Sequence, residues 1–261
     1  MAVFVLLLTL LAACAKVPIT GRKQLSLVPE SMMLSLSFSS YQEFLSQNPP
    51  VPATDPNAQM VTITGTRIKN AVVEYMKKAN LSKQIKDYAW EYKLVKDAAV
   101  NAWCMPGGKI VVYTGILPVT KDEAGLAVVM SHEVAHAVAR HGSERMSQQL
   151  AITMGAIGLD VAMQQKPQET RDIFMSLYGV SATLGSLAYS RQHEYEADKM
   201  GLVFMAMAGY DPERAISFWE SMAAQGGAKP PELLSTHPGD ENRIAALKAF
   251  LPEAKKYYKV R

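Results

Sequence analysis

Apolar side chains recur at helical spacing over much of the chain. Between residues 57 and 80 they occupy every third or fourth position, which predicts an amphipathic helix with one face toward a core. Further helices are predicted over residues 31–47, 120–140 and 190–208, after Asp211-Pro212, and from about Pro238. Thr120 and Glu123 have the spacing of a capping box, which predicts that the 120–140 helix begins at Thr120.

Two later segments, 144–163 and 169–188, are rich in Ala, Met, Leu and Gly. Asp160 and Arg171 interrupt them, and each segment is shorter than a membrane span, which needs ~20 apolar residues. We therefore expect buried core helices here.

A short β-rich region separates the helices. Polar and apolar positions alternate from Tyr88 to Leu94, residues 100–104 continue the extended chain, and Pro106-Gly107-Gly108 predicts a turn. Lys109 to Thr114 is a second β-rich run. We expect a small hairpin-like sheet flanking the 120–140 helix, in an α+β fold that is mainly helical.

The first thirteen residues predict a signal peptide, because Val3 to Ala13 carries no charge and is too short to span a bilayer. Leu11-Ala12-Ala13-Cys14 is typical of a bacterial lipobox, in which Cys14 is acylated and anchors the protein in membrane lipid. The alternative is an ordinary signal peptide with a chance cysteine. Residues 14–56 are then a tether with a short helix, ended by four prolines between positions 49 and 56, and residues 57–261 form the main domain.

Net charge and cysteine content exclude two classes of protein. The 261 residues carry a net charge of only +3, and no block of Lys and Arg is present, so we expect no nucleic-acid partner. Two cysteines, Cys14 and Cys104, are too few for a disulfide framework.

The strongest chemical signal is His132-Glu133-Val134-Ala135-His136. On a helix the two histidines lie on one face, one turn apart, where they can share one metal ion. Glu133 could take a proton from water as that water attacks a carbonyl group. The pattern predicts zinc-dependent hydrolysis, which needs a third protein ligand. His141, just beyond this helix, is expected to be structural.

The best candidate for the third ligand lies on the predicted 190–208 helix. Glu194 and Asp198 are one turn apart, so Glu194 could bind the metal while Asp198 hydrogen-bonds the far nitrogen of a ligand histidine. The alternative is that these acids form a solvated face with Arg191 and Lys199. Spacing alone does not decide between the two.

Several spaced motifs follow one another in a fixed order: residues 101–117, His132 to His136, Glu194 to Asp198, and Ser235-Thr236-His237-Pro238 with Arg243. In these motifs residues 60–250 resemble the zinc metallopeptidases of family forty-eight, which includes the CAAX-prenyl endopeptidases and the HtpX-type and Oma-type proteases. The resemblance implies a gluzincin-type domain with one Zn²⁺ per chain, held by His132, His136 and Glu194 rather than Glu196. Val17 to Arg22 is also similar to the start of the family's bacterial lipoprotein branch.

These features predict a membrane-tethered zinc metalloendopeptidase of the cell envelope, on the periplasmic face of the outer membrane. Its substrates would be unfolded or misassembled envelope proteins, bound as an added β-strand along an edge strand formed by Lys109, Ile110, Val111 and Val112. One alternative is a chaperone or assembly factor that binds client chains in the same groove with little cleavage. Another is a structural lipoprotein whose zinc only staples helices.

His237 has three candidate roles. It could donate a hydrogen bond to the oxyanion that forms as water adds to the carbonyl, with Arg243 as a supporting charge. It could instead occupy the zinc's open position and hold the enzyme latent. In the third, Thr236-His237-Pro238 only caps the last helix. We favour latency, because an unspecific protease facing its own envelope needs restraint.

Overall fold

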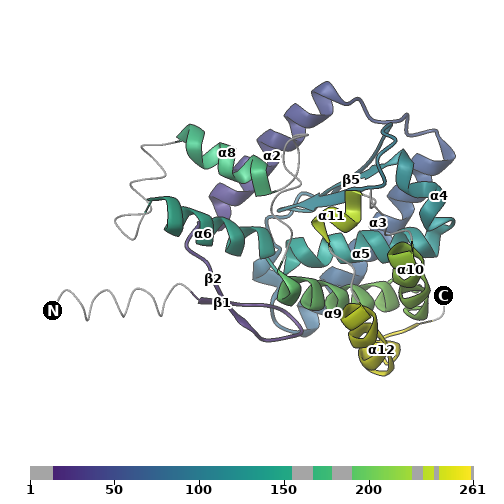
Figure 1. Cartoon of the computed structure of the whole chain (residues 1–261). Helices are drawn as coiled ribbons and strands as arrows, with labels where there is room; N and C mark the ends of the chain where they lie inside the picture. Colours follow the sequence, from purple (N-terminus) through teal and green to yellow (C-terminus); the bar gives the residue numbers. More distant parts are fainter. Residues whose placement is uncertain (1–13, 155–166, 178–189, 225–231, 238–240, 260–261) are drawn as a thin grey trace.

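The computed structural model describes residues 14–154, 167–177, 190–224, 232–237 and 241–259 (Figure 1). The predicted signal peptide, Pro238 and parts of the predicted 144–163 and 169–188 helices lie outside the described residues.

Helices make up most of the described chain, and the predicted mainly helical α+β class is confirmed. The α-helices are α2 (Glu30–Gln47), α3 (Pro56–Lys78), α4 (Leu117–Thr120), α5 (Glu123–Val138), α6 (His141–Met154), α8 (Pro167–Leu177), α9 (Arg191–Met207), α10 (Glu213–Ala224), α11 (Glu232–Thr236) and α12 (Glu241–Lys255). Short 3-10 turns lie at Ser82–Gln84 and Thr114–Ile116.

The start of α5 differs from the prediction. Thr120 ends α4, and Lys121 adopts a positive φ of 67° that separates α4 from α5. Asp122 is the N-cap of α5, because its side chain accepts a hydrogen bond from the Gly125 N–H at 2.7 Å. The predicted capping box at Thr120 is therefore wrong: the N-cap of this helix is Asp122, and Thr120 belongs to the short helix before it.

The main sheet has the order β3-β5-β4, with β3 at Glu91–Val95, β4 at Ala102–Met105 and β5 at Lys109–Tyr113. β4 and β5 form the antiparallel hairpin, whereas β3 runs parallel to β5. The predicted turn at Pro106-Gly107-Gly108 joins β4 to β5, so the expected hairpin is present. The expectation that residues 88–104 form one extended run is wrong, because β3 is a separate strand that pairs in parallel with the other side of β5.

The predicted edge strand is also wrong. Lys109, Ile110, Val111 and Val112 lie in β5, which is the central strand and is paired on both sides. Every residue of β5 is buried. A nearly continuous apolar run is typical of a strand covered on both faces. Because both of its edges are already paired, β5 cannot accept a substrate chain.

Helices cover both faces of this sheet. Side chains on one face join the core with α3 and α5: Leu94, Ala102, Cys104, Ile110 and Val112. Side chains on the other face pack with α2, α6 and α8: Val95, Trp103, Met105, Val111 and Tyr113. In Figure 1, α2 and α8 lie to the upper left of the sheet and α5 and α9 run beneath it.

The predicted tether is folded. Its strands β1 (Cys14–Lys16) and β2 (Lys23–Leu25) form a small antiparallel sheet. Buried Gln24 donates a hydrogen bond from Nε2 to the carbonyl oxygen of Ala139 at 2.9 Å, just past the end of α5. The segment therefore rests against the helices that carry the candidate site.

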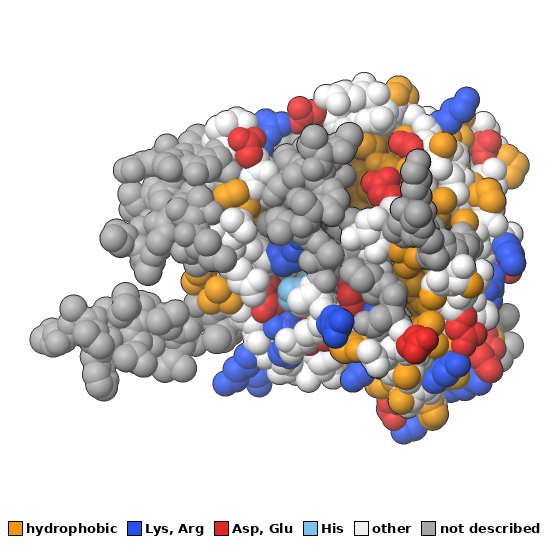
Figure 2. Space-filling view, viewed as in Figure 1, with side chains coloured by type: hydrophobic (Ala, Val, Ile, Leu, Met, Phe, Trp, Pro, Cys, Tyr) orange, Lys and Arg blue, Asp and Glu red, His pale blue; other side chains and the backbone are white. Residues whose placement is uncertain are grey.

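Within the described part of the chain, no helix combines the length and the apolar character needed to cross a bilayer. On the face seen in Figure 2, the described Lys and Arg side chains are intermingled with Asp and Glu side chains.

Candidate metal centre

His132, His136 and Glu194 meet where α5 packs against α9. The Nε2 atoms of the two histidines are 3.1 Å apart, because four residues of helix bring both rings to the same face. The carboxylate oxygens of Glu194 lie 3.4 Å from Nε2 of His132 and 3.4 Å from Nε2 of His136. All three side chains are buried, so the two imidazoles and the carboxylate are turned toward one small volume.

His237, the residue directly after α11, joins the same group. Its Nδ1 lies 3.0 Å from Oε1 of Glu194 and 3.2 Å from Nε2 of His132. One ligand atom from each of His132, His136, Glu194 and His237 lies within 4.8 Å of the others. Three imidazole nitrogens and a carboxylate oxygen are donors that zinc prefers.

Glu133 lies beside this donor set on the side of His237. Its Oε1 is 3.4 Å from Nε2 of His237 and, among the described residues, has no hydrogen-bond partner although it is buried. An unsatisfied buried carboxylate oxygen is costly unless a further group binds there. The residues present therefore fit a zinc site with Glu133 at its margin.

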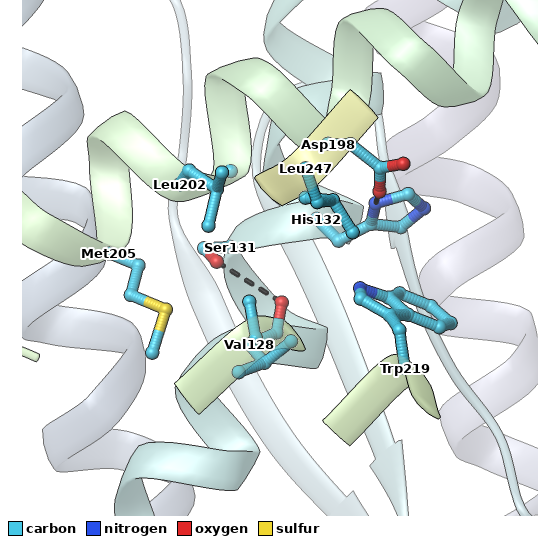
Figure 3. A pocket seen from close by; sticks show the side chains of 10 residues that line it. Val128, Ser131, His132, Asp198, Leu202, Met205, Trp219 and Leu247 are labelled. Atoms are coloured by element: carbon cyan, nitrogen blue, oxygen red, sulfur yellow. Dashed lines mark hydrogen bonds and ion pairs between the residues drawn. The ribbon is translucent and has the colours of Figure 1, made fainter. Parts of the chain in front are cut away.

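A second set of residues contacts His132 and Glu194 from outside the donor set. Asp198 Oδ1 lies 3.1 Å from Nδ1 of His132, and Figure 3 shows the two side chains directed toward each other. Arg243 donates hydrogen bonds to both oxygens of Asp198, at 2.9 and 2.7 Å, and lies 2.9 Å from Oε2 of Glu194. The indole of Trp219 lies against this group, with its ring centre 4.6 Å from Cζ of Arg243 and 5.2 Å from the His132 ring.

Arg243 thus reaches Glu194 and Asp198, and its Nη1 also donates to the carbonyl oxygen of His237 at 3.3 Å. This places Arg243 against two acids of α9 and the backbone of the His237 segment. A buried guanidinium that neutralises two carboxylates stabilises their ionised forms.

Electrostatics in the site follow from burial and these pairs. Burial lowers the pKa of His132, but hydrogen bonds to Asp198 and Glu194 and the charges of both acids outweigh it and raise the pKa to about 9. Burial raises the pKa of Glu133. For Asp198, burial opposes ionisation, yet Arg243 and His132 hold the pKa below its ordinary value. Glu133 is therefore the carboxylate whose surroundings favour accepting a proton.

Another group of residues was missed by sequence reasoning. His141, at the start of α6, places its Nδ1 2.9 Å from Nδ1 of His136. Its Nε2 lies 3.1 Å from Oε2 of Glu196, which itself contacts Arg22. Burial lowers the pKa of His141 to about 4, so its ring is neutral near pH 7. The spacing of His141 after His136 carried no sign of this contact.

The family model for "Peptidase family M48" matches residues 63–251. The chain belongs to peptidase family M48. The resemblance to family forty-eight is confirmed, and family M48 peptidases use zinc, which agrees with the donor set described above.

Relatives within and near this family include mitochondrial and bacterial proteases. The chain is 32% identical over 246 residues to "Mitochondrial metalloendopeptidase OMA1" of Schizosaccharomyces pombe, an alignment that covers 91% of this chain and 66% of the relative. It is 29% identical over 246 residues to the human protein "Metalloendopeptidase OMA1, mitochondrial", covering 92% and 46%. It is 29% identical over 170 residues to "Beta-barrel assembly-enhancing protease" of Escherichia coli, covering 60% and 33%. The chain therefore spans between a third and two thirds of the length of these relatives.

Proposed function

We propose that this chain is a zinc metalloendopeptidase that hydrolyses peptide bonds of unfolded or misassembled proteins in the cell envelope. The observation that supports this most is the convergence of His132, His136 and Glu194, with the buried carboxylate of Glu133 beside them. Membership of family M48 supports the same chemistry. The names of the relatives, a beta-barrel assembly-enhancing protease and mitochondrial metalloendopeptidases, support a role in protein quality control.

His132, His136 and Glu194 would hold the zinc, which supplies a Lewis acid for the scissile carbonyl and lowers the pKa of water at the site. Glu133 would take a proton from the attacking water as its oxygen bonds to the carbonyl carbon. The same carboxyl group would then give that proton to the amide nitrogen as the C–N bond breaks. Asp198, through Nδ1 of His132, would keep the Nε2 lone pair of that ring directed at the metal.

For the substrate strand we propose β4 in place of β5. β4 is at the edge of the sheet and packs against α5, the helix of His132 and His136. Asn101 accepts a hydrogen bond from the Tyr113 N–H, and hydrogen-bonded residues alternate along an antiparallel strand, so the backbone groups of Ala102 and Cys104 face away from β5. The Ala102 N–H donates to Oδ1 of Asn101 at 2.8 Å, and a substrate strand would have to replace this bond. An extended peptide added there would lie alongside the metal centre and would be held through its backbone, with little demand on its sequence.

We also propose that His237 keeps the enzyme latent. Its ring lies within the donor set, and a zinc ion held there by four protein donors would have no position open for water. His237 would therefore have to move away before water could bind. The segment that carries His237 also reaches β4, because the Leu233 N–H donates to the carbonyl oxygen of Val100 at 3.1 Å and Asn101 donates to Glu232 at 3.1 Å. Moving this segment would open the zinc and the substrate strand together.

The proposed location is the periplasmic face of the outer membrane, with acylated Cys14 as the anchor. Cys14 begins β1, so an anchor at this residue would hold the folded part of the chain close to the lipid surface. The lipobox pattern before Cys14 supports this location.

The decisive test compares Glu133→Gln with Glu123→Gln, a matched change in the partly exposed first turn of the same helix. With zinc bound and an unfolded protein as substrate, Glu133→Gln should bind the substrate normally but cleave it ~10²–10⁴-fold more slowly. Glu123→Gln should cleave at the wild-type rate. Cleavage by Glu133→Gln at the wild-type rate would show that Glu133 is not the base.

The same experiment separates the enzyme from a chaperone. If zinc-loaded wild type and zinc-loaded His237→Ala both bind the unfolded substrate but leave it intact, the chaperone alternative replaces the proposed activity. His237→Ala belongs in this comparison, since latency predicts faster cleavage by that variant and an oxyanion role predicts slower cleavage. Unchanged cleavage would leave His237 only a structural role.

A further inference from the structure

A cluster of polar side chains, four of them buried and ionisable, lies beside His136 on the side of its Nδ1. It consists of residues from α6 and α9 together with two from the segment between β1 and β2: His141, Glu144, His193, Glu196, Thr20 and Arg22. The two histidines are stacked, with ring centres 4.4 Å apart. The hydrolytic mechanism uses none of these six residues.

Arg22 is at the centre of this cluster. Its two terminal nitrogens donate to the two oxygens of Glu144, at 2.8 and 2.6 Å, in the bidentate geometry that arginine forms with carboxylates. Its Nε donates to both oxygens of Glu196, at 3.0 and 2.9 Å. Thr20 adds a hydrogen bond from Oγ1 to Oε1 of Glu196 at 2.7 Å. One guanidinium group thus balances two buried acids that come from different helices.

From Glu196 the contacts continue to the metal centre. Oε2 of Glu196 lies 3.1 Å from Nε2 of His141, and Nδ1 of His141 lies 2.9 Å from Nδ1 of His136. Because an ionised carboxylate only accepts hydrogen bonds, His141 carries its proton on Nε2 and presents a lone pair at Nδ1. That lone pair accepts the Nδ1–H of His136. The Nε2 of His136 then carries the ring's other lone pair, which is directed toward the donor set of His132 and Glu194.

We propose that Arg22 is a positioning residue of the zinc site. It orients Glu196, Glu196 fixes the tautomer of His141, and His141 holds the ring of His136 with Nε2 toward the donor set. The segment that follows Cys14 is therefore part of the metal centre. This inference rests on the proposed role of His136 as a ligand.

The test measures zinc affinity in the full chain by competition with a coloured chelator. Arg22→Ala should raise the zinc dissociation constant ~10–100-fold, the size of effect known for groups that orient a ligand histidine. Arg22→Lys should also weaken binding, because an ammonium group cannot make the bidentate contact. Lys23→Ala changes the next residue, which is exposed and begins β2; it is the matched control and should bind zinc as the wild type does.

A role confined to folding predicts a different result. In that case Arg22→Ala lowers the thermal midpoint of the zinc-free protein but leaves the zinc dissociation constant within about twofold of wild type, and the proposal is overturned. Cobalt substituted for zinc gives a second readout, since a displaced His136 ring changes the visible absorption of the bound ion. An unchanged cobalt spectrum in Arg22→Ala would count against the proposal in the same way.

Two further variants keep the test interpretable. Thr20→Val removes one hydrogen bond to Glu196 and leaves the ion pairs, so it should weaken zinc binding by less than Arg22→Ala does. It serves as the test if Arg22→Ala fails to fold. His136→Ala tests the ligand itself. If His136→Ala still holds one zinc tightly, the assignment of His136 as a ligand fails. If His136→Ala loses zinc while Arg22→Ala and Thr20→Val bind it with normal affinity, only the positioning role is refuted.

Discussion

Gly201 sets how closely α9 approaches α5, and replacing it tests whether this packing defines the metal centre. Glu194, Asp198 and Gly201 follow one another at spacings of four and three residues, so they share one face of α9. A Cβ atom at position 201 would lie 3.3 Å from both the N and the Cα of His132 and 3.4 Å from the carbonyl carbon of Ser131. Glycine therefore allows the ligand-bearing parts of the two helices to meet.

The expected cost follows from these distances. Carbon atoms pack best at ~3.5–4.0 Å, so Gly201→Ala requires the helices to separate by a few tenths of an ångström. Overpacking costs about 1–3 kcal/mol, while alanine regains about 1 kcal/mol of helix propensity, so the net loss for Gly201→Ala is at most about 2 kcal/mol. Gly201→Val places two more methyl groups near the His132 backbone and should lose about 2–4 kcal/mol. Because Glu194 moves with α9, zinc affinity should fall in the same order.

The assay is urea unfolding of the zinc-free protein together with chelator competition for zinc. Gln192→Val, at an exposed position on the same helix, controls for the β-branched side chain and should change both quantities little. Wild-type zinc affinity in Gly201→Val would refute the idea that the approach of α9 to α5 sets the distance between Glu194 and the histidines.

Three further predictions concern single side chains. Glu194→Ala should lose zinc on dialysis against a weak chelator because it removes a donor, whereas Glu196→Ala should keep zinc with ~10–100-fold weaker affinity; equal loss in both would contradict the assigned ligand. Burial raises the pKa of Glu144, but Arg22 and His193 outweigh burial and lower this pKa to about 2. The stability contributed by ionised Glu144 is therefore complete above about pH 4.5 and is lost as the pH falls toward 2. The difference in unfolding free energy between zinc-free wild type and Glu144→Gln should therefore shrink by ~1–2 kcal/mol between pH 5 and pH 3, and a constant difference would contradict the Arg22 pair. Cys14→Ser should move the protein from the membrane fraction to the soluble fraction, and mass spectrometry that finds no acyl group on wild-type Cys14 would refute the lipid anchor.

Local patterns predicted the helices well, because each helix carries its own periodicity. The predicted 57–80, 31–47 and 190–208 helices correspond to α3, α2 and α9, with ends within two residues. The four-residue spacing of His132 and His136 fixes their common face without reference to the rest of the chain.

The sheet was predicted less well, because strand order depends on contacts between distant parts of the chain. The apolar run in β5 gave its strand character but was read as an edge strand, although apolar residues at successive positions are typical of a strand buried on both faces. One face of β5 is covered by α2, which comes before β5 in the sequence, and the other face by α5, which comes after it. Neither layer can be seen in the pattern of β5 alone.

The residues that orient the candidate ligand His136 were the hardest part of the site to predict from sequence patterns. Arg22 is 174 residues from Glu196 and 122 from Glu144, and no periodicity connects them. Had the burial of Glu144 and Glu196 been known, the need for a cation between them would have followed, since buried acids require a partner. Sequence reasoning assigned Arg22 to a tether outside the main domain. Short spacings within helices thus encode the donors of the site, whereas the orientation of one donor depends on an N-terminal segment. Removing that segment to obtain an isolated 57–261 domain would remove Arg22 from the metal centre.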